Sequence, residues 1–95
     1  MDQITISRNE EESRFEAFGG GNLLGYIDYK IDGKVMEMPH TLVFPEYEGQ
    51  GVVSALAKQS LDMVRKIDSE LRIKPTCPFI DVWMKRHKDY EDLRA

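Results

Sequence analysis

The chain has 95 residues, a formal net charge of −4 and 41% hydrophobic residues. A chain of this length can bury only a modest core, so we expect residues 1–95 to form one domain. It has no apolar run long enough to span a membrane and no signal-peptide pattern at its start, which predicts a cytoplasmic protein without membrane attachment. The single cysteine excludes an internal disulfide framework and is typical of a reducing compartment.

The charge is distributed unevenly along the chain. Residues 1–48 hold 4 Lys/Arg and 10 Asp/Glu, a charge of −6, whereas residues 49–95 hold 9 and 7, a charge of +2. An acidic half argues against general nucleic-acid binding, which needs a broad basic face. The mildly basic half has two interpretations: a site for a small polyanion, or ordinary solvated surface.

Alternating apolar and polar residues predict a series of antiparallel strands in the first half. The alternation covers Ile4–Ile6 and 14–18, separated by a charged turn at 9–12, and GGGN at 19–22 predicts a flexible loop. The Asp32-Gly33 pair predicts a two-residue hairpin loop, in which Tyr29 pairs with Met36 and Ile27 with Met38. Pro39 interrupts the return strand, so we expect the strand to bend or leave its neighbour there.

Helical spacing begins after Gly51. An apolar stripe predicts a helix ending near Ser69, and Leu71–Ile73 then predicts a short strand. Pro78 is suited to start a last helix, in which Phe79, Val82, Trp83 and Arg86 recur at helical spacing. The stripe of the long helix consists of Val53, Ala57, Ser60 or Leu61, Val64, Ile67 and Leu71. The expected fold class is α+β, a mostly antiparallel sheet with one strand–helix–strand crossover and a short C-terminal helix.

Two glycines flank Gln50 just before the long helix. Glycine there allows a sharp turn and a close approach of a ligand to the backbone, and the first amides of a helix lack internal partners. The segment therefore suits a phosphate or pyrophosphate, although glycines that merely turn the chain explain the spacing equally well. It is not a P-loop, because no Gly-Lys-Ser/Thr follows, and the third glycine of a dinucleotide fingerprint is absent.

Three blocks of the chain resemble one known family. "PHTLVFPEYEGQGVVSAL" is similar to the acyl-CoA-binding motif of the GNAT superfamily of N-acetyltransferases, and "CPFIDVWMKRH" and "HKDYEDL" resemble the C-terminal blocks of its short, single-domain members. The resemblance runs from about Phe15 to Leu93 and implies a trimmed acyl-CoA N-acyltransferase fold. Glu48 stands where the wider superfamily has Arg or Gln, Val53 where Gly or Ala is usual, and Lys88 where proline is usual.

The resemblance implies acetyl-CoA as cosubstrate and a site for it. Its pantetheine arm would pair with the backbone of one strand, which is strand addition by a ligand. Its pyrophosphate would meet the amides that follow the glycines. The implied residues are Leu42, Val43, Phe44, Gly49, Gln50, Gly51, Val52, Val53, Ser54 and Cys77.

Acetyl transfer needs a deprotonated amine and protonation of the leaving thiolate. His40 is a candidate base, or a histidine that ends a strand. Cys77 is a candidate nucleophile or acid near the thioester, or a buried thiol without chemistry. We expect structural roles for Trp83, His87 and Tyr90. The histidines and the cysteine are too few and scattered to predict a metal site.

Three functions follow as hypotheses from different classes. The first is an N-acetyltransferase acting on an unidentified amine. The second is an acyl-CoA-binding module or sensor with little turnover, and the third is an interaction domain without a CoA site. We favour the first, with acetyl-CoA and an amine as partners, no nucleic acid, and a monomer or weak dimer.

Overall fold

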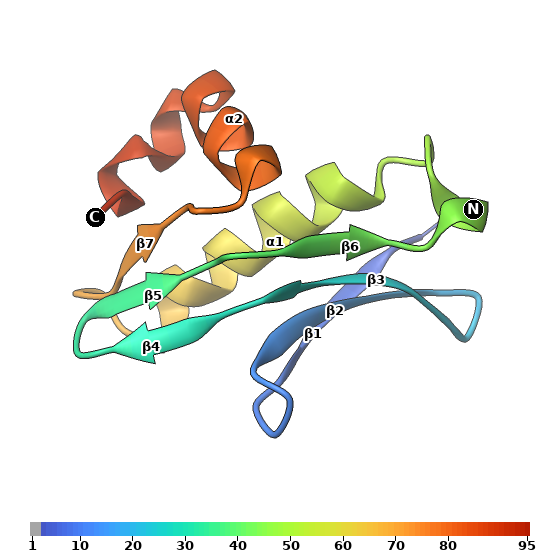
Figure 1. Cartoon of the computed structure of the whole chain (residues 1–95), viewed down its shortest axis with the longest axis horizontal. Helices are drawn as coiled ribbons and strands as arrows, with labels where there is room; N and C mark the ends of the chain where they lie inside the picture. Colours follow the sequence, from blue (N-terminus) through green and yellow to red (C-terminus); the bar gives the residue numbers. More distant parts are fainter. Residues whose placement is uncertain (1–2) are drawn as a thin grey trace.

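A computed structural model of the chain describes residues 3–95. The chain forms seven short strands, two α-helices and two 3-10 turns within those residues (Figure 1). None of its helices is both long and apolar enough to cross a membrane. In chain order the elements are β1 (Thr5–Asn9), β2 (Arg14–Gly19), β3 (Asn22–Asp28), β4 (Lys30–Asp32), β5 (Val35–Glu37), β6 (Thr41–Val43), η1 (Pro45–Tyr47), α1 (Val52–Ile67), β7 (Arg72–Lys74), α2 (Pro78–Arg86) and η2 (Lys88–Leu93).

The strands form two sheets, one of four strands and one of three. One sheet has the order β1-β2-β3-β6 and is antiparallel throughout. The other has the order β4-β5-β7, in which β5 and β7 are parallel. The chain changes sheet at Tyr29 and again between Glu37 and Thr41. The expected α+β class is confirmed, and Pro39 lies where the sequence predicted that the strand leaves its neighbour.

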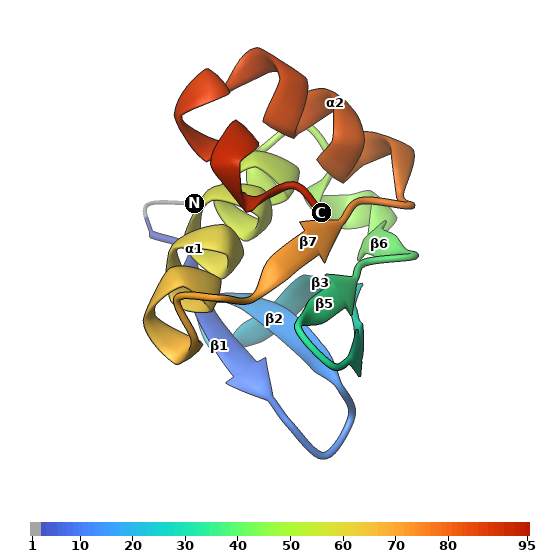
Figure 2. The same ribbon diagram turned by 90° about the vertical axis from the view of Figure 1, so that its left-hand side faces the viewer.

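Helix α1 supplies the centre of the core. Figure 2 shows it between the C-terminal α2–η2 segment and the first strands, β1 and β2. Its fully buried face packs on Phe15, Leu24 and Ile27 of the sheet in one hydrophobic cluster. That face consists of Val52, Leu56, Ala57, Ser60, Leu61 and Val64. The predicted stripe is thus right in its middle and wrong at its ends, because Val53 is half-buried at the helix start and Ile67 is exposed at the helix end.

Two predicted turns differ from the structure. The hairpin between β4 and β5 pairs Asp32 with Val35, so its loop is Gly33-Lys34 and Ile31 faces Met36. The loop is one residue later than predicted and Gly33 in it has a positive φ. The partner of Met36 is therefore Ile31 in place of Tyr29, and Ile27 pairs with Thr41 in place of Met38, so both predicted pairs are wrong. Ile31 is exposed. The 19–22 segment is a tight turn rather than a flexible loop, since Gly19 pairs with Asn22 across two glycines of positive φ.

The C-terminal segment is held on α1 by polar contacts. The Tyr90 hydroxyl donates to Asp62 at 2.7 Å, and its ring packs edge-on against Trp83. Arg65 reaches both carboxylate oxygens of Asp92 at 2.8 Å. Burial by itself would raise the pKa of Asp62, but hydrogen bonds from Tyr90 and Lys58 outweigh it and hold that pKa below its usual value. The expected structural role of Tyr90 thus has a defined physical basis.

Because the folded-state pKa of Asp62 is depressed, its contribution to stability is present above the unfolded pKa, about 4, and is lost as pH falls through the folded value. We expect Tyr90→Phe, which keeps the ring, to lower the free energy of unfolding by about 1 kcal/mol near neutral pH. The difference between variant and wild type should shrink as pH falls through the folded-state pKa of Asp62, which lies below its usual value. Denaturant unfolding at neutral pH and at a series of acidic pH values measures it, and a difference that does not change with pH would contradict this origin.

Candidate functional site

A cleft opens where the two sheets part. The pairing of β5 with β7 extends to Met38, whose N–H donates to Lys74 O at 3.0 Å and whose carbonyl accepts from Cys77 N–H at 2.9 Å. Past Met38 the two chain segments diverge, because one continues into β6 and the other turns into α2 at Pro78. The gap between them is therefore set by the strand break at Pro39 and the helix start at Pro78, and it leads to the start of α1.

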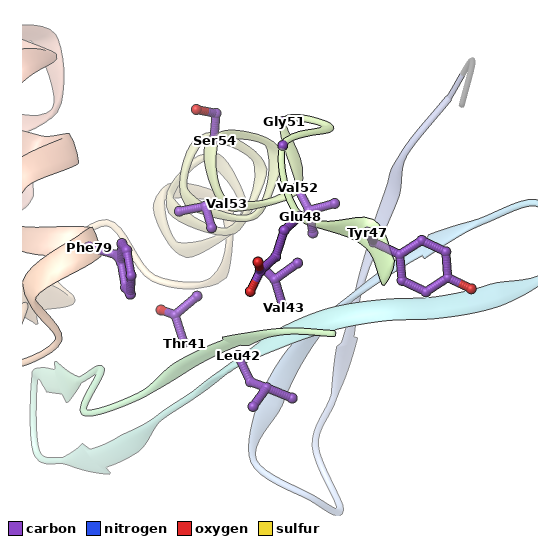
Figure 3. A pocket seen from close by; sticks show the side chains of 11 residues that line it. Thr41, Leu42, Val43, Tyr47, Glu48, Gly51, Val52, Val53, Ser54 and Phe79 are labelled. Atoms are coloured by element: carbon purple, nitrogen blue, oxygen red, sulfur yellow. The ribbon is translucent and has the colours of Figure 1, made fainter. Parts of the chain in front are cut away.

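The cleft contains a pocket of about 460 Å³ (Figure 3). Its floor is β6, its wall is the first turn of α1, and the ring of Phe79 from α2 stands at its side. The residues around it are mostly apolar or glycine, and Glu48 is the one charged residue among them. The lining consists of Thr41, Leu42, Val43, Tyr47, Glu48, Gly49, Gly51, Val52, Val53, Ser54 and Phe79.

Strand β6 presents an open backbone edge to this pocket. Its only partner among the described strands is β3. Phe44 N–H donates to Leu24 O, and Asp28 N–H donates to His40 O, each at 3.0 Å. In an antiparallel pair the hydrogen-bonded residues alternate, so the N–H and C=O groups of Thr41 and Val43 point away from β3. These groups are free to pair with an extended ligand.

The start of α1 forms the second half of the pocket. Gly49 and Gly51 adopt positive φ angles of 79° and 80°, which side-chain-bearing residues rarely reach. Gly51 is the N-cap residue, no side chain caps the helix, and its first turn contains no acidic residue. The amides of this turn therefore lack the usual internal partners and carry the positive end of the helix dipole. The glycines do turn the chain, and that turn leaves these amides uncapped, whereas phosphate binding there stays a prediction.

Cys77 lies beside the inner end of the pocket without lining it. Its thiol is buried and donates to the Thr41 hydroxyl at 3.3 Å, and Thr41 itself faces the pocket. Cys77 follows β7 in the chain and is the N-cap residue of α2. The packing therefore connects the thiol to the pocket through one side chain.

His40 belongs to a different hollow of the surface. Together with Glu12, Ser13 and Asp28 it lines a space of about 430 Å³ where the chain changes sheet. No hydrogen bond within residues 3–95 joins its ring to Cys77. The structure thus brings Cys77 to the pocket and leaves His40 at its own hollow, one residue before Thr41.

The remaining predicted binding residues divide into two groups. Leu42, Val43, the two glycines and the residues 52–54 line the pocket. Phe44 and Gln50 do not line it, and the Gln50 amide donates to Glu46 O at 3.4 Å. Thr41, Tyr47, Glu48 and Phe79 do line it and were not predicted. Among the described residues no group of three His, Cys, Asp or Glu side chains is arranged to hold a metal ion.

The chain has an acyl-CoA N-acyltransferase fold. In it, the open edge of β6 lies beside a glycine turn that leads into the uncapped helix α1. The family model described as GCN5-related N-acetyl-transferase matches residues 14–93, and the chain belongs to that family.

Known proteins similar to this chain agree with this assignment. A GCN5-like protein of Staphylococcus aureus, solved by NMR, superposes with a TM-score of 0.71 at 27% identity, covering 100% of this chain and 91% of that one. The PaiA N-acetyltransferase of Thermoplasma acidophilum, solved in complex with coenzyme A, gives a TM-score of 0.55 at 19% identity, covering 80% of this chain and 48% of that one. This second likeness supports the fold alone.

Protein NATD1 of Bos taurus is 35% identical over 60 residues, which are 62% of this chain. The match spans 51% of NATD1, so this chain corresponds to about half the length of that relative.

Proposed function

We propose that the protein transfers the acetyl group of acetyl-CoA to an amine. The observation that carries the proposal is the pocket between the open edge of β6 and the uncapped start of α1. An acyl-CoA needs these two features at once, because its pantetheine arm contains amides that can pair with a strand and its pyrophosphate is an anion suited to helix amides. The N-acetyltransferase of Thermoplasma acidophilum, which shares the fold, is itself solved with coenzyme A bound.

In this arrangement the pantetheine arm lies along Thr41 and Val43. The pyrophosphate lies at the amides of Val52, Val53 and Ser54, next to the glycine turn. The thioester then reaches the inner end of the pocket, beside Thr41 and the Cys77 thiol. Binding in this way uses backbone groups, which is consistent with the mostly apolar lining.

The transfer itself proceeds by direct attack. The neutral amine nitrogen forms a bond to the thioester carbonyl carbon, and collapse of the tetrahedral oxyanion breaks the carbon–sulfur bond. The nitrogen, which carries an extra proton after the attack, releases that proton to solvent as the amide forms. His40 takes the proton of the ammonium, from the hollow that also holds Glu12 and Asp28. The Thr41 hydroxyl, which lines the pocket, gives its proton to the departing CoA thiolate and takes the Cys77 proton in its place, and Cys77 is reprotonated by the reverse path once the products leave. Cys77 acts as an acid here because its thiol donates to Thr41 and no His40 contact activates it as a nucleophile within the described residues.

Calorimetric titration with acetyl-CoA and then CoA tests the binding step. Intact mass after incubation with acetyl-CoA tests the role of Cys77, and thiol release with a panel of amines tests transfer. We expect binding, no added acetyl group on the protein, and release of CoA with at least one amine. A folded sample that binds neither ligand overturns the proposal, and an acetyl adduct that disappears in Cys77→Ser would make the cysteine a nucleophile.

Glu48 is expected to weaken the binding of CoA in the pocket. Its carboxylate is exposed at the pocket edge and points toward Val43, close to the glycine turn (Figure 3). A negative charge near a pyrophosphate is unfavourable, although solvent reduces the effect. We expect Glu48→Gln to tighten CoA binding by roughly threefold at low salt, measured by calorimetry. Glu46→Gln, in the same turn but outside the pocket lining, is the control, and equal gains in both variants would point to overall charge instead.

A further inference from the structure

The hollow that holds His40 lies where the chain changes sheet, and we call it the strand-break hollow. Three separate segments line its space of about 430 Å³: the β1–β2 turn at Glu12 and Ser13, the junction of β3 and β4 at residues 28–30, and the strand break at Pro39 and His40. These segments belong to both sheets, and none of their residues lines the pocket described above. The strand-break hollow is therefore a second space beside the same strand.

Side-chain alternation along β6 places the strand-break hollow opposite the pocket. Asp28 N–H donates to His40 O at 3.0 Å, which continues the β3–β6 register one residue beyond the Ile27–Thr41 pair. Successive side chains of a strand point to opposite faces. Thr41 points toward α1 and Leu42 points away from it (Figure 3). His40 therefore lies on the face of Leu42, next to the residue at which the thioester is proposed to bind, and on the other side of the strand.

Backbone hydrogen bonds fix the walls of the strand-break hollow. Tyr29 N–H donates to Ser13 O at 2.9 Å and ties the β1–β2 turn to the junction of β3 and β4. Within the turn, Glu12 N–H donates to Asn9 Oδ1 at 3.1 Å, and Ser13 adopts a positive φ of 52°. These contacts shape the hollow before a ligand arrives, so a ligand loses little free energy to the ordering of its site.

The charge of the strand-break hollow suits a cation. Glu12 and Asp28 line it, and neither carboxylate forms an ion pair within residues 3–95. Three cations of the surrounding strands each have another carboxylate as partner or opposite neighbour. These pairs are Arg8 with Glu10 at 3.6 Å, Arg14 with Glu16 at 2.7 Å, and Lys30 with Glu37 directly opposite in the β4–β5 ladder. Since opposite charges across a ladder attract each other, Lys30 is drawn toward Glu37 although it also lines the hollow.

We propose that the strand-break hollow binds the acceptor, and that the acceptor is a small amine with a second cationic group. The reacting nitrogen lies at His40, and the second cation lies between the carboxylates of Asp28 and Glu12 and keeps its protons throughout the transfer. This inference rests on the proposed function, since it needs the thioester at Thr41, and it goes further in naming the class of acceptor. Acceptor and cosubstrate then reach the reacting carbon from opposite faces of β6.

Acetyl transfer to three acceptors of equal carbon chain tests the second cation. The acceptors are 1,4-diaminobutane, butylamine and 4-aminobutanoate, and release of the CoA thiol measures kcat/KM for each. We expect the diamine to exceed butylamine roughly tenfold at low salt, because a monoamine leaves the carboxylates without a partner. We expect 4-aminobutanoate to be the poorest acceptor, and the diamine advantage to fall as ionic strength rises. An advantage no larger than the two equivalent nitrogens of the diamine provide would overturn this inference and leave the proposed function intact.

A variant of the β1–β2 turn tests the assignment of Glu12. We expect Glu12→Gln to raise KM for the diamine roughly threefold, more than it changes kcat, so that the advantage over butylamine falls. Glu11→Gln removes the same charge from the neighbouring exposed residue of the turn, which does not line the hollow, and should keep the advantage. The same loss in both variants would point to overall charge and contradict the assignment.

Backbone amide NMR of the protein saturated with CoA provides a measurement that does not depend on turnover. Addition of 1,4-diaminobutane should shift the amide signals of Ser13, Asp28 and Lys30, which line the strand-break hollow, more than that of Gly51 at the start of α1. Diamine turnover without these shifts would contradict the hollow as the acceptor site. If CoA binds and no amine releases it, the proposed function fails, and the shifts alone then decide whether the hollow binds the diamine.

Discussion

Replacing Gly51 by glutamate is expected to weaken CoA binding by at least about 100-fold, or about 2.7 kcal/mol. Gly51 is the N-cap residue and has a φ of 80°. A Cβ at this position would meet nothing within 4 Å, so the space at the pocket edge can accommodate a new side chain. A carboxylate there competes with the pyrophosphate for the first amides of α1 and opposes its charge. Calorimetric titration of the folded variant with CoA measures the loss.

Two further variants separate charge from backbone strain at Gly51. Gly51→Ala carries the same unfavourable φ without the charge, so it should cost about 1 kcal/mol of stability and leave most of the CoA affinity. Gly33→Glu introduces the same strain and charge in a hairpin turn away from the pocket, at φ 61°. We expect Gly33→Glu to bind CoA like wild type. Unchanged affinity in Gly51→Glu would remove the start of α1 from the site.

Replacing Gly25 by alanine is expected to lower the free energy of unfolding by about 1–3 kcal/mol. Gly25 lies opposite Val43 in the β3–β6 pair, and a Cβ there would be 2.3 Å from Leu42 O. This atom is backbone and cannot rotate away, so β6 has to shift or the strands have to separate. Since β6 is also the floor of the pocket, CoA affinity should fall together with stability.

Gly20→Ala is the matched control for Gly25→Ala. At Gly20 the φ angle is 58° and a Cβ would meet nothing within 4 Å, so the cost there is conformational and about 1 kcal/mol. Denaturant unfolding gives both values, and hydrogen exchange at the Leu42 amide, which faces β3, should accelerate only in Gly25→Ala. A cost for Gly25→Ala no larger than that of Gly20→Ala would contradict the steric explanation.

The sequence allowed most of the fold to be predicted where local chemistry decides the structure. The α1 helix, the break at Pro39 and the start of α2 at Pro78 all depend on residues with strong local preferences. The sequence did not predict the β4–β5 register. A loop of Asp32-Gly33 and a loop of Gly33-Lys34 both contain Gly33, so the local sequence allows either one. The structure has the second, with Ile31 opposite the buried Met36.

The site was predicted where it is local in sequence and incomplete where it is assembled from distant elements. The glycine turn and the residues after it are contiguous, and the motif identified them together. Phe79 joins the pocket only because α2 turns back after β7, which no spacing reveals. The spacing of Phe79, Val82, Trp83 and Arg86 along α2 is typical of a helix face that packs on the core. In the structure Phe79 and Val82 are exposed instead, and the four residues line a hollow beside the pocket.

The length of β6 limits what else its open edge can attract. An unpaired strand edge is a template for edge-to-edge association between copies of a protein. Here the strand has three residues, and Pro39 and Pro45 lie on either side of it without an amide hydrogen to offer. The edge is therefore long enough for the few amides of a pantetheine arm, and too short to start an intermolecular sheet. Pro39, which helps to open the site, and Pro45 thus also limit edge-to-edge association of the unliganded protein.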